Sequence, residues 1–136
     1  MIDLTVTRLP KRGTCHPIVV EGELDICGSP QLQKELAAIL NDHGNGFGQG
    51  DRIVIHTEGG EFVLEDGRSF SSAGLGYIDA SGLHAMVGGL MNAQERGGSV
   101  CLVASNPGRV RQVLSIVGLD KVFATYEDSA APYLMD

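Results

Sequence analysis

Hydrophobic and polar positions alternate near the start of the chain, which is the pattern of β-strands that bury one face. Residues 4–9 alternate in this way, and residues 18–24 form a second apolar segment, with a turn expected from Pro10 to Pro17. Further short apolar segments have the length and composition of strands. They span residues 52–56, 76–78, 99–104 and 122–124.

Between these strands, apolar residues recur at helical spacing. Ser29 and Pro30 are a typical helix start, with Ser29 as the N-cap. The apolar residues that follow on one helix face are Leu32, Leu36, Ile39 and Leu40. Further helices are expected from Ser81 to Gly97, from Asn106-Pro107 to Gly118, and from about Glu127 onward.

Strands alternate with helices through the second half of the chain, which indicates an α/β sheet with right-handed crossovers. Because the first two strands form a hairpin, a mixed sheet is favoured over a purely parallel one. Asp66-Gly67 is a favoured hairpin turn, and the strand-like residues 61–65 and 68–70 flank it. The sequence therefore predicts an extra hairpin near residues 60–72. No linker divides residues 1–136, so one domain is expected.

Composition narrows the classes of function. The net charge of −7 argues against direct nucleic-acid binding, which requires clustered Lys and Arg. No apolar run is long enough to span a membrane, and the first residues, Met1 and Ile2 included, do not resemble a signal peptide. A cytoplasmic protein without a membrane partner is expected.

Cysteine and histidine are scattered along the chain. Cys15, Cys27 and Cys101 are odd in number and lack C-x-x-C spacing, which argues against disulfides and zinc. Cys101 lies in an apolar run and is expected to be a buried hydrophobic residue. The four histidines occur singly, so no metal site is predicted. They are His16, His43, His56 and His84.

Ser81 is the residue on which a functional interpretation depends. It separates an apolar strand end from a helix, so it is predicted to be the helix N-cap. A serine hydrolase is disfavoured, because Ser81 lacks a G-x-S-x-G context and His84 follows it within the same helix. No catalytic residue and no cofactor are predicted. A phosphate on Ser81 would gain helix amides but would be repelled by Asp79.

A glycine-rich loop at residues 44–50 is the one sequence feature that favours ligand binding. Its four glycines could cradle a phosphate, but no Gly-Lys-Ser/Thr follows them. A nucleotide-binding loop is therefore disfavoured.

Four segments, in order, resemble one family. Residues 77–83 read Tyr-Ile-Asp-Ala-Ser-Gly-Leu, and residues 21–25 read Glu-Gly-Glu-Leu-Asp. Residues 97–103 read Gly-Gly-Ser-Val-Cys-Leu-Val, and residues 110–119 combine Val110, Val113 and Leu114 with a final Gly-Leu. Together these segments are similar to the motifs of STAS domains, the bacterial anti-sigma factor antagonists.

The resemblance implies a mixed sheet of four to five strands with helices mainly on one side. It implies an anti-sigma factor antagonist that binds an anti-sigma factor serine kinase and thereby regulates sigma-dependent transcription. That kinase phosphorylates a serine, which by position is Ser81, and a phosphatase resets it. Asp25 and Asp79 match acidic family positions and are expected to shape the partner surface. Gly82 would let a partner approach closely, and His84 and Met91 are the helix residues expected to face that partner.

The chain departs from the family pattern in three places. Ala80 replaces the usual Ser or Thr before the acceptor, which leaves Ser81 as the one acceptor. His56 stands where many members have Asp, and we expect it to be partly exposed. The hairpin adds about a dozen residues, as a partner-specific lip ahead of Ser81 or as a surface insertion. The alternative function is a STAS-like scaffold or small-ligand sensing module that is never phosphorylated.

Overall fold

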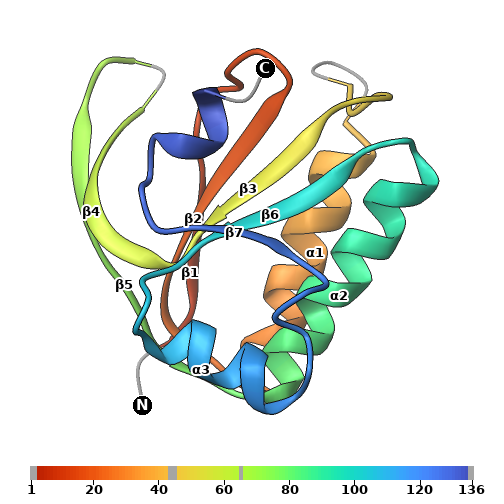
Figure 1. The fold of residues 1–136 in the computed structure, drawn as a ribbon. Helices are drawn as coiled ribbons and strands as arrows, with labels where there is room; N and C mark the ends of the chain where they lie inside the picture. The colour runs from red at the N-terminus through yellow and green to blue at the C-terminus, as the bar shows by residue number, and fades with distance from the viewer. Residues whose placement is uncertain (1–2, 43–45, 65, 135–136) are drawn as a thin grey trace.

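The fold is a mixed β-sheet with helices against one face (Figure 1). The computed structural model describes residues 3–42, 46–64 and 66–134. The strands are β1 (Thr5–Arg8), β2 (Cys15–Leu24), β3 (Arg52–His56), β4 (Glu58–Val63), β5 (Ser69–Ile78), β6 (Ser99–Val103) and β7 (Ala124–Tyr126). The helices are α1 (Ser29–Leu40), α2 (Ala80–Glu95) and α3 (Arg109–Ile116), followed by a 3-10 turn, η1 (Ala131–Leu134).

The strand order confirms the α/β fold with a mixed sheet. The strands follow the order β4-β5-β2-β3-β6-β7, and β1 pairs with β2. β5, β2, β3, β6 and β7 run parallel, whereas β1 and β4 are antiparallel to their partners. The described residues form seven strands rather than four to five. The predicted hairpin accounts for β4 and for the first part of β5, whose last residues are the strand predicted at 76–78.

β1 and β5 pair with the same edge of β2, and this arrangement brings Asp25 and Asp79 side by side. β1 pairs with β2 up to Glu21, and β5 pairs with β2 from Gly22 onward. The register shifts after Gly22, whose φ of +101° favours glycine. Leu24 then pairs with Ile78, so Asp25 and Asp79 leave the sheet from adjacent strands.

The main hydrophobic core lies between the sheet and the three helices, which confirms that helices cover mainly one side (Figure 1). α1 and α2 pack closely because Gly89 faces α1. A Cβ atom on Gly89 would lie 2.7 Å from Leu36 Cδ1. This contact explains one of the two glycines inside α2.

The opposite sheet face carries a smaller buried cluster, which the C-terminal segment covers. Its buried members are Cys15, Val54, Cys101 and Val103. Tyr133 of η1 packs against this cluster, and Arg52 Nη2 donates to the Pro132 carbonyl at 2.7 Å. Cys101 is buried as predicted, and burial raises the pKa of its thiol to about 11.

His56 is buried on this second face, so the expectation that it is partly exposed is wrong. Its Nε2 lies 2.6 Å from the Tyr133 hydroxyl, and the Phe62 ring of β4 meets it edge-on at 5.2 Å. Burial, together with the positive charge of Arg12, lowers the pKa of His56 to about 4. The hairpin and the C-terminal segment exclude water from this side chain, an effect that β3 alone does not reveal.

The buried His56 makes stability depend on pH. In the unfolded chain His56 binds a proton near pH 6.5, but in the folded chain only near pH 4. The unfolded state therefore binds more protons in this interval, and the free energy of unfolding falls as the pH falls. The expected loss between pH 7 and pH 5 is about 2 kcal/mol. Urea unfolding at both pH values measures it, and His56→Gln should remove most of the difference. Equal pH dependence in both proteins would contradict this assignment.

Several predicted boundaries are wrong. Gly28, not Ser29, is the N-cap of α1, because the Asp25 carboxylate turns the chain one residue earlier. β2 begins at Cys15 and includes Pro17, in place of a turn that lasts until Pro17.

The third helix and the C-terminal end also differ from expectation. α3 begins at Arg109, after a Gly108 N-cap, rather than at Asn106-Pro107. The last strand is β7, at 124–126 instead of 122–124. The residues after it form the short turn η1 instead of a helix from Glu127. Here the chain is held by contacts with the second sheet face, which local sequence does not specify.

Candidate functional site

Ser81 is not the N-cap of α2, contrary to the sequence-based expectation. Asp79 holds that position in extended conformation, and its Oδ1 accepts hydrogen bonds from the amides of Ser81 and Gly82 at 3.0 and 3.4 Å. Ser81 is the second residue of the helix. Both Asp and Ser are good N-caps, so the sequence Asp-Ala-Ser-Gly offers two candidates.

The Ser81 hydroxyl has no structural task that the described residues reveal. Ser81 is half-buried, and none of its neighbours in the described ranges forms a hydrogen bond with its Oγ. Because Asp79 caps the helix, this hydroxyl is available for chemistry with another molecule. Ala80 beside it carries no hydroxyl, so Ser81 has the one side-chain hydroxyl of the turn formed by residues 79–82.

Acidic groups dominate the electrostatics around Ser81. The Tyr77 hydroxyl donates to Asp79 Oδ2 at 3.3 Å. The negative charge of Asp79, with a smaller effect from Asp25, raises the pKa of Tyr77. Arg109, at the start of α3, opposes this shift. Asp25 and Asp79 thus create a negative field at the start of α2, in a chain that is already acidic.

Asp25 has a structural task in the connection between β2 and α1. Its Oδ1 accepts from the amides of Cys27 and Gly28 at 2.9 and 3.0 Å. Its backbone carbonyl accepts from the Ser29 hydroxyl at 2.6 Å. Asp25 therefore orders the loop that borders the start of α2.

Gly82 is buried, and its small size is required inside the chain. A Cβ atom on Gly82 would lie 2.5 Å from Leu24 Cγ and 2.8 Å from the Leu24 carbonyl oxygen. These distances are shorter than normal contacts, so α2 can begin this close to β2 only with glycine at this position. Gly82 does not belong to the exposed surface around Ser81.

His84 is exposed and lines an apolar groove of about 480 Å³ between α2 and the segment after α3. The groove residues are Ala80, Leu83, His84, Val87, Gly88, Met91, Val117 and Leu119. A Cβ atom on Gly88 would point into open space, unlike one on Gly89. Ser81 does not line the groove itself, but its neighbour Ala80 and His84, three residues later in α2, both do.

Several large apolar side chains are exposed in the groove or in the segments next to α2 and α3, and the sequence indicated few of them. Met91 and Val117 are 59% and 44% exposed, and Ile116 beside them is 76% exposed. Ile26, in the connection between β2 and α1, is 74% exposed. The exposure of Ile26 could have been predicted, because Ile26 is an isolated apolar residue in the turn between Asp25 and Cys27.

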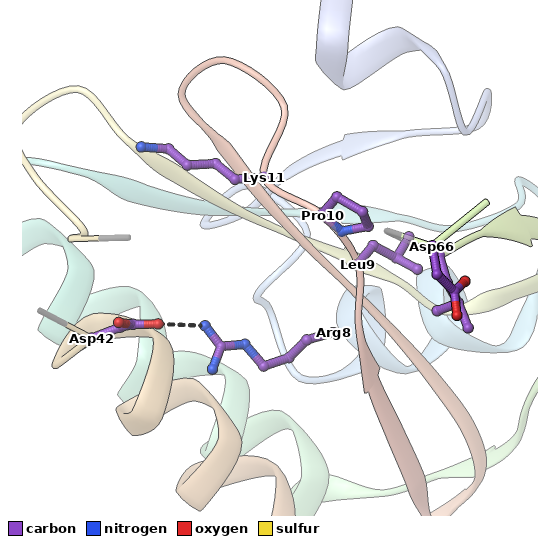
Figure 2. A pocket seen from close by; sticks show the side chains of 7 residues that line it. Arg8, Leu9, Pro10, Lys11, Asp42 and Asp66 are labelled. Atoms are coloured by element: carbon purple, nitrogen blue, oxygen red, sulfur yellow. Dashed lines mark hydrogen bonds and ion pairs between the residues drawn. The ribbon is translucent and has the colours of Figure 1, made fainter. Parts of the chain in front are cut away.

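The hairpin tip lies far from Ser81, so the hairpin is not a lip ahead of it. α2 begins at the lower end of Figure 1, whereas the hairpin tip and the β1–β2 connection lie at the upper end. There Leu64 and Asp66 line a polar hollow of about 750 Å³ together with Arg8, Pro10 and Lys11 (Figure 2). Arg8 points across this hollow and pairs with Asp42 at 3.1 Å. The hairpin is also more than a surface insertion, because Phe62 of β4 packs against the buried His56.

The glycine-rich loop is described from residue 46, and Gly44 and Asn45 lie outside the described residues. Phe47 is buried, and its ring lies 5.2 Å from that of His16. Within the described ranges no three His, Cys, Asp or Glu residues are placed to hold a metal ion, and His43 lies outside these ranges. None of the helices in the described part is long and apolar enough to cross a membrane.

Comparisons with known proteins place the chain in a family. Residues 8–131 match the STAS domain family. An anti-sigma factor antagonist from Mycobacterium paratuberculosis is similar in structure, with a TM-score of 0.64, 20% identity, and coverage of 96% of this chain and 92% of that one. No protein of curated function is significantly similar in sequence.

Two structures of SpoIIAA are also similar. The unphosphorylated anti-sigma factor antagonist SpoIIAA has a TM-score of 0.60 and 16% identity, over 96% of this chain and 94% of that one. The phosphorylated form of the Bacillus cell fate determinant SpoIIAA has a TM-score of 0.59 and 17% identity, over 97% and 100%. At these identities the likeness concerns the fold. The chain belongs to the STAS domain family, and its fold is that of anti-sigma factor antagonists.

Proposed function

We propose that this STAS domain is an anti-sigma factor antagonist that binds an anti-sigma factor serine kinase and is switched by phosphorylation of Ser81. The observation that carries the proposal is the Ser81 hydroxyl, which no described residue uses, beside Ala80 and close in sequence to His84, two residues that line an apolar groove. The unmodified surface would bind the kinase, and a phosphatase would restore it after phosphorylation. We further propose that residues 1–136 act as one cytoplasmic domain without enzyme activity of its own.

Charge supports this direction of the switch. A phosphate adds almost two negative charges at neutral pH. The Asp79 carboxylate already accepts hydrogen bonds from the amides of Ser81 and Gly82. A phosphoryl group on Ser81 would therefore meet a negative carboxylate and not two free N–H groups. Its charge would have to lose water when the apolar groove is covered by a partner, which is unfavourable. Phosphorylation should therefore weaken the complex with the kinase.

The partner surface proposed here is formed by Ser81, His84, Met91 and Val117, with Asp25 and Asp79 at its acidic border. Tyr77 lies at the same border, 40% exposed. Apolar side chains in the centre with polar groups at the rim are typical of protein interfaces.

Incubation with ATP and a candidate anti-sigma factor kinase, such as one encoded beside this chain, tests the proposal. Mass spectrometry should find one phosphate, absent in Ser81→Ala and retained in Ser115→Ala, whose serine is exposed on α3. Ser81→Asp should weaken kinase binding at least about tenfold through repulsion and desolvation, measured by calorimetry. Ser115→Asp is the charge-matched control. Phosphate on another residue, or equal binding by both Asp variants, would argue against the switch.

A further inference from the structure

A second cavity, of about 390 Å³, lies on the sheet face opposite the helices. Its walls come from the β1–β2 connection, the hairpin strand β4 and the C-terminal segment that leads into η1. Figure 1 shows η1 on this face, beside the hairpin. The volume is within the range of small-molecule sites in proteins. The cavity and Ser81 belong to different surfaces, so a ligand here is independent of the proposed phosphorylation.

One wall of the cavity carries a cation and two neutral polar groups. The Arg12 guanidinium carbon lies 4.0 Å from the centre of the Tyr133 ring. The Tyr133 hydroxyl lies 2.6 Å from His56 Nε2. His56 Nδ1 is buried, and no residue in the described ranges forms a hydrogen bond with it. Such an unpartnered buried atom is rare in proteins and calls for an explanation, of which an external hydrogen-bond partner is one.

The remaining walls are mostly apolar. Leu9, Pro10, Pro17 and Phe62 line the cavity, and the Phe62 ring contacts both His56 and Phe70. Glu61 is the acidic residue of the lining, and its carboxylate accepts a hydrogen bond from the Ser71 hydroxyl. Arg12 is thus the lining cation, and it faces an aromatic and aliphatic interior.

We propose that this cavity binds a small organic carboxylate with a planar apolar ring. Arg12 would pair with the carboxylate in a charge-assisted hydrogen bond, which is stronger than a neutral one. Phe62, the prolines and Tyr133 would enclose the ring through edge and face contacts. The hairpin then has a defined role, because β4 contributes Glu61, Phe62 and Val63 to the site.

Titration of the ¹⁵N-labelled chain with phenylacetate, 3-phenylpropionate and indole-3-acetate tests this proposal by NMR. At least one acid should produce saturable shifts at cavity residues, with a dissociation constant in the millimolar range or below. Phenylacetamide, which has nearly the same shape without the charge, should bind at least about tenfold more weakly than phenylacetate.

Matched variants separate specific binding from general attraction of anions. Arg12→Gln should weaken acid binding at least about tenfold, and Arg12→Lys should restore part of it. Lys11→Gln removes one positive charge from the same connection without altering the cavity lining, so its affinity should equal that of the native chain. Phe62→Leu should weaken binding while it keeps an apolar side chain at the site.

Three outcomes would overturn the proposal. The first is the absence of saturable chemical-shift changes with all three acids at about 10 mM. The second is equal affinity for phenylacetate and phenylacetamide. The third is an equal loss of affinity for the acid in Arg12→Gln and Lys11→Gln. The NMR spectrum of each variant reports whether it is folded.

Discussion

Gly82→Ala is expected to lower the free energy of unfolding by about 2–3 kcal/mol, because overpacking at a tight contact forces the backbone to move. The added Cβ would lie 2.8 Å from the Leu24 carbonyl oxygen, which belongs to a paired strand and cannot turn away as a side chain does. The Gly82 φ is not positive, so the effect is a steric clash and not backbone strain. Urea unfolding measures the change.

Gly88→Ala is the matched control, because it makes the same substitution six residues later in the same helix. Apart from the surrounding backbone of α2, no atom lies within 4 Å of a Cβ built on Gly88. Alanine there should raise stability by up to about 1 kcal/mol, since it is the better helix former. If both variants shift the unfolding midpoint equally, the contact between α2 and β2 does not explain Gly82.

Tyr133→Ala is expected to lower the free energy of unfolding by about 2–4 kcal/mol, through loss of ring packing and of a buried hydrogen bond. Without the Tyr133 hydroxyl, both ring nitrogens of His56 lack a partner among the described residues. The ring also covers the second cluster, which includes Cys101. In a Cys27→Ser background, which removes the exposed cysteine, Tyr133→Ala should accelerate the reaction of the buried thiols with a thiol reagent.

Two variants separate the contributions of Tyr133. Tyr133→Phe keeps the ring and should cost about 1–2 kcal/mol for the unpartnered His56. Leu134→Ala, in the same turn, changes a side chain that is 79% exposed and should leave stability and thiol reactivity unchanged. Equal thiol reactivity in Tyr133→Ala and Leu134→Ala would show that Tyr133 does not cover the cluster.

Elements with a strong local signal could be predicted from the sequence. Asp66-Gly67 indicated a hairpin, and the apolar spacing after Ser81 indicated α2; both are present. β5 extends beyond the residues predicted from the sequence. Ser71, Ser72 and Gly74 do not form an alternating pattern with apolar residues, so the sequence did not indicate a strand there. They are in a strand because they pair with β4, and that pairing is not encoded in local propensity.

The candidate site was predicted in part. The position of Ser81 at the start of α2 was foreseen, but the capping role belongs to Asp79. His84 is exposed as expected, whereas Gly82 is required by Leu24 of another strand. The burial of His56 depends on Phe62 and Tyr133, which lie in distant segments. Contacts between such segments are determined by tertiary packing, and a single sequence does not display them.

The capping role of Asp79 has a consequence for how the proposed modification would act. The Asp79 carboxylate already accepts hydrogen bonds from two amides of the first turn. A phosphoryl group on Ser81 would therefore not bind these amides and would extend toward solvent. The modified and unmodified chains should then superimpose, and the partner would be rejected by an altered surface charge alone. A phosphate ester held in this way is accessible to a phosphatase, so its removal requires no movement of the helix.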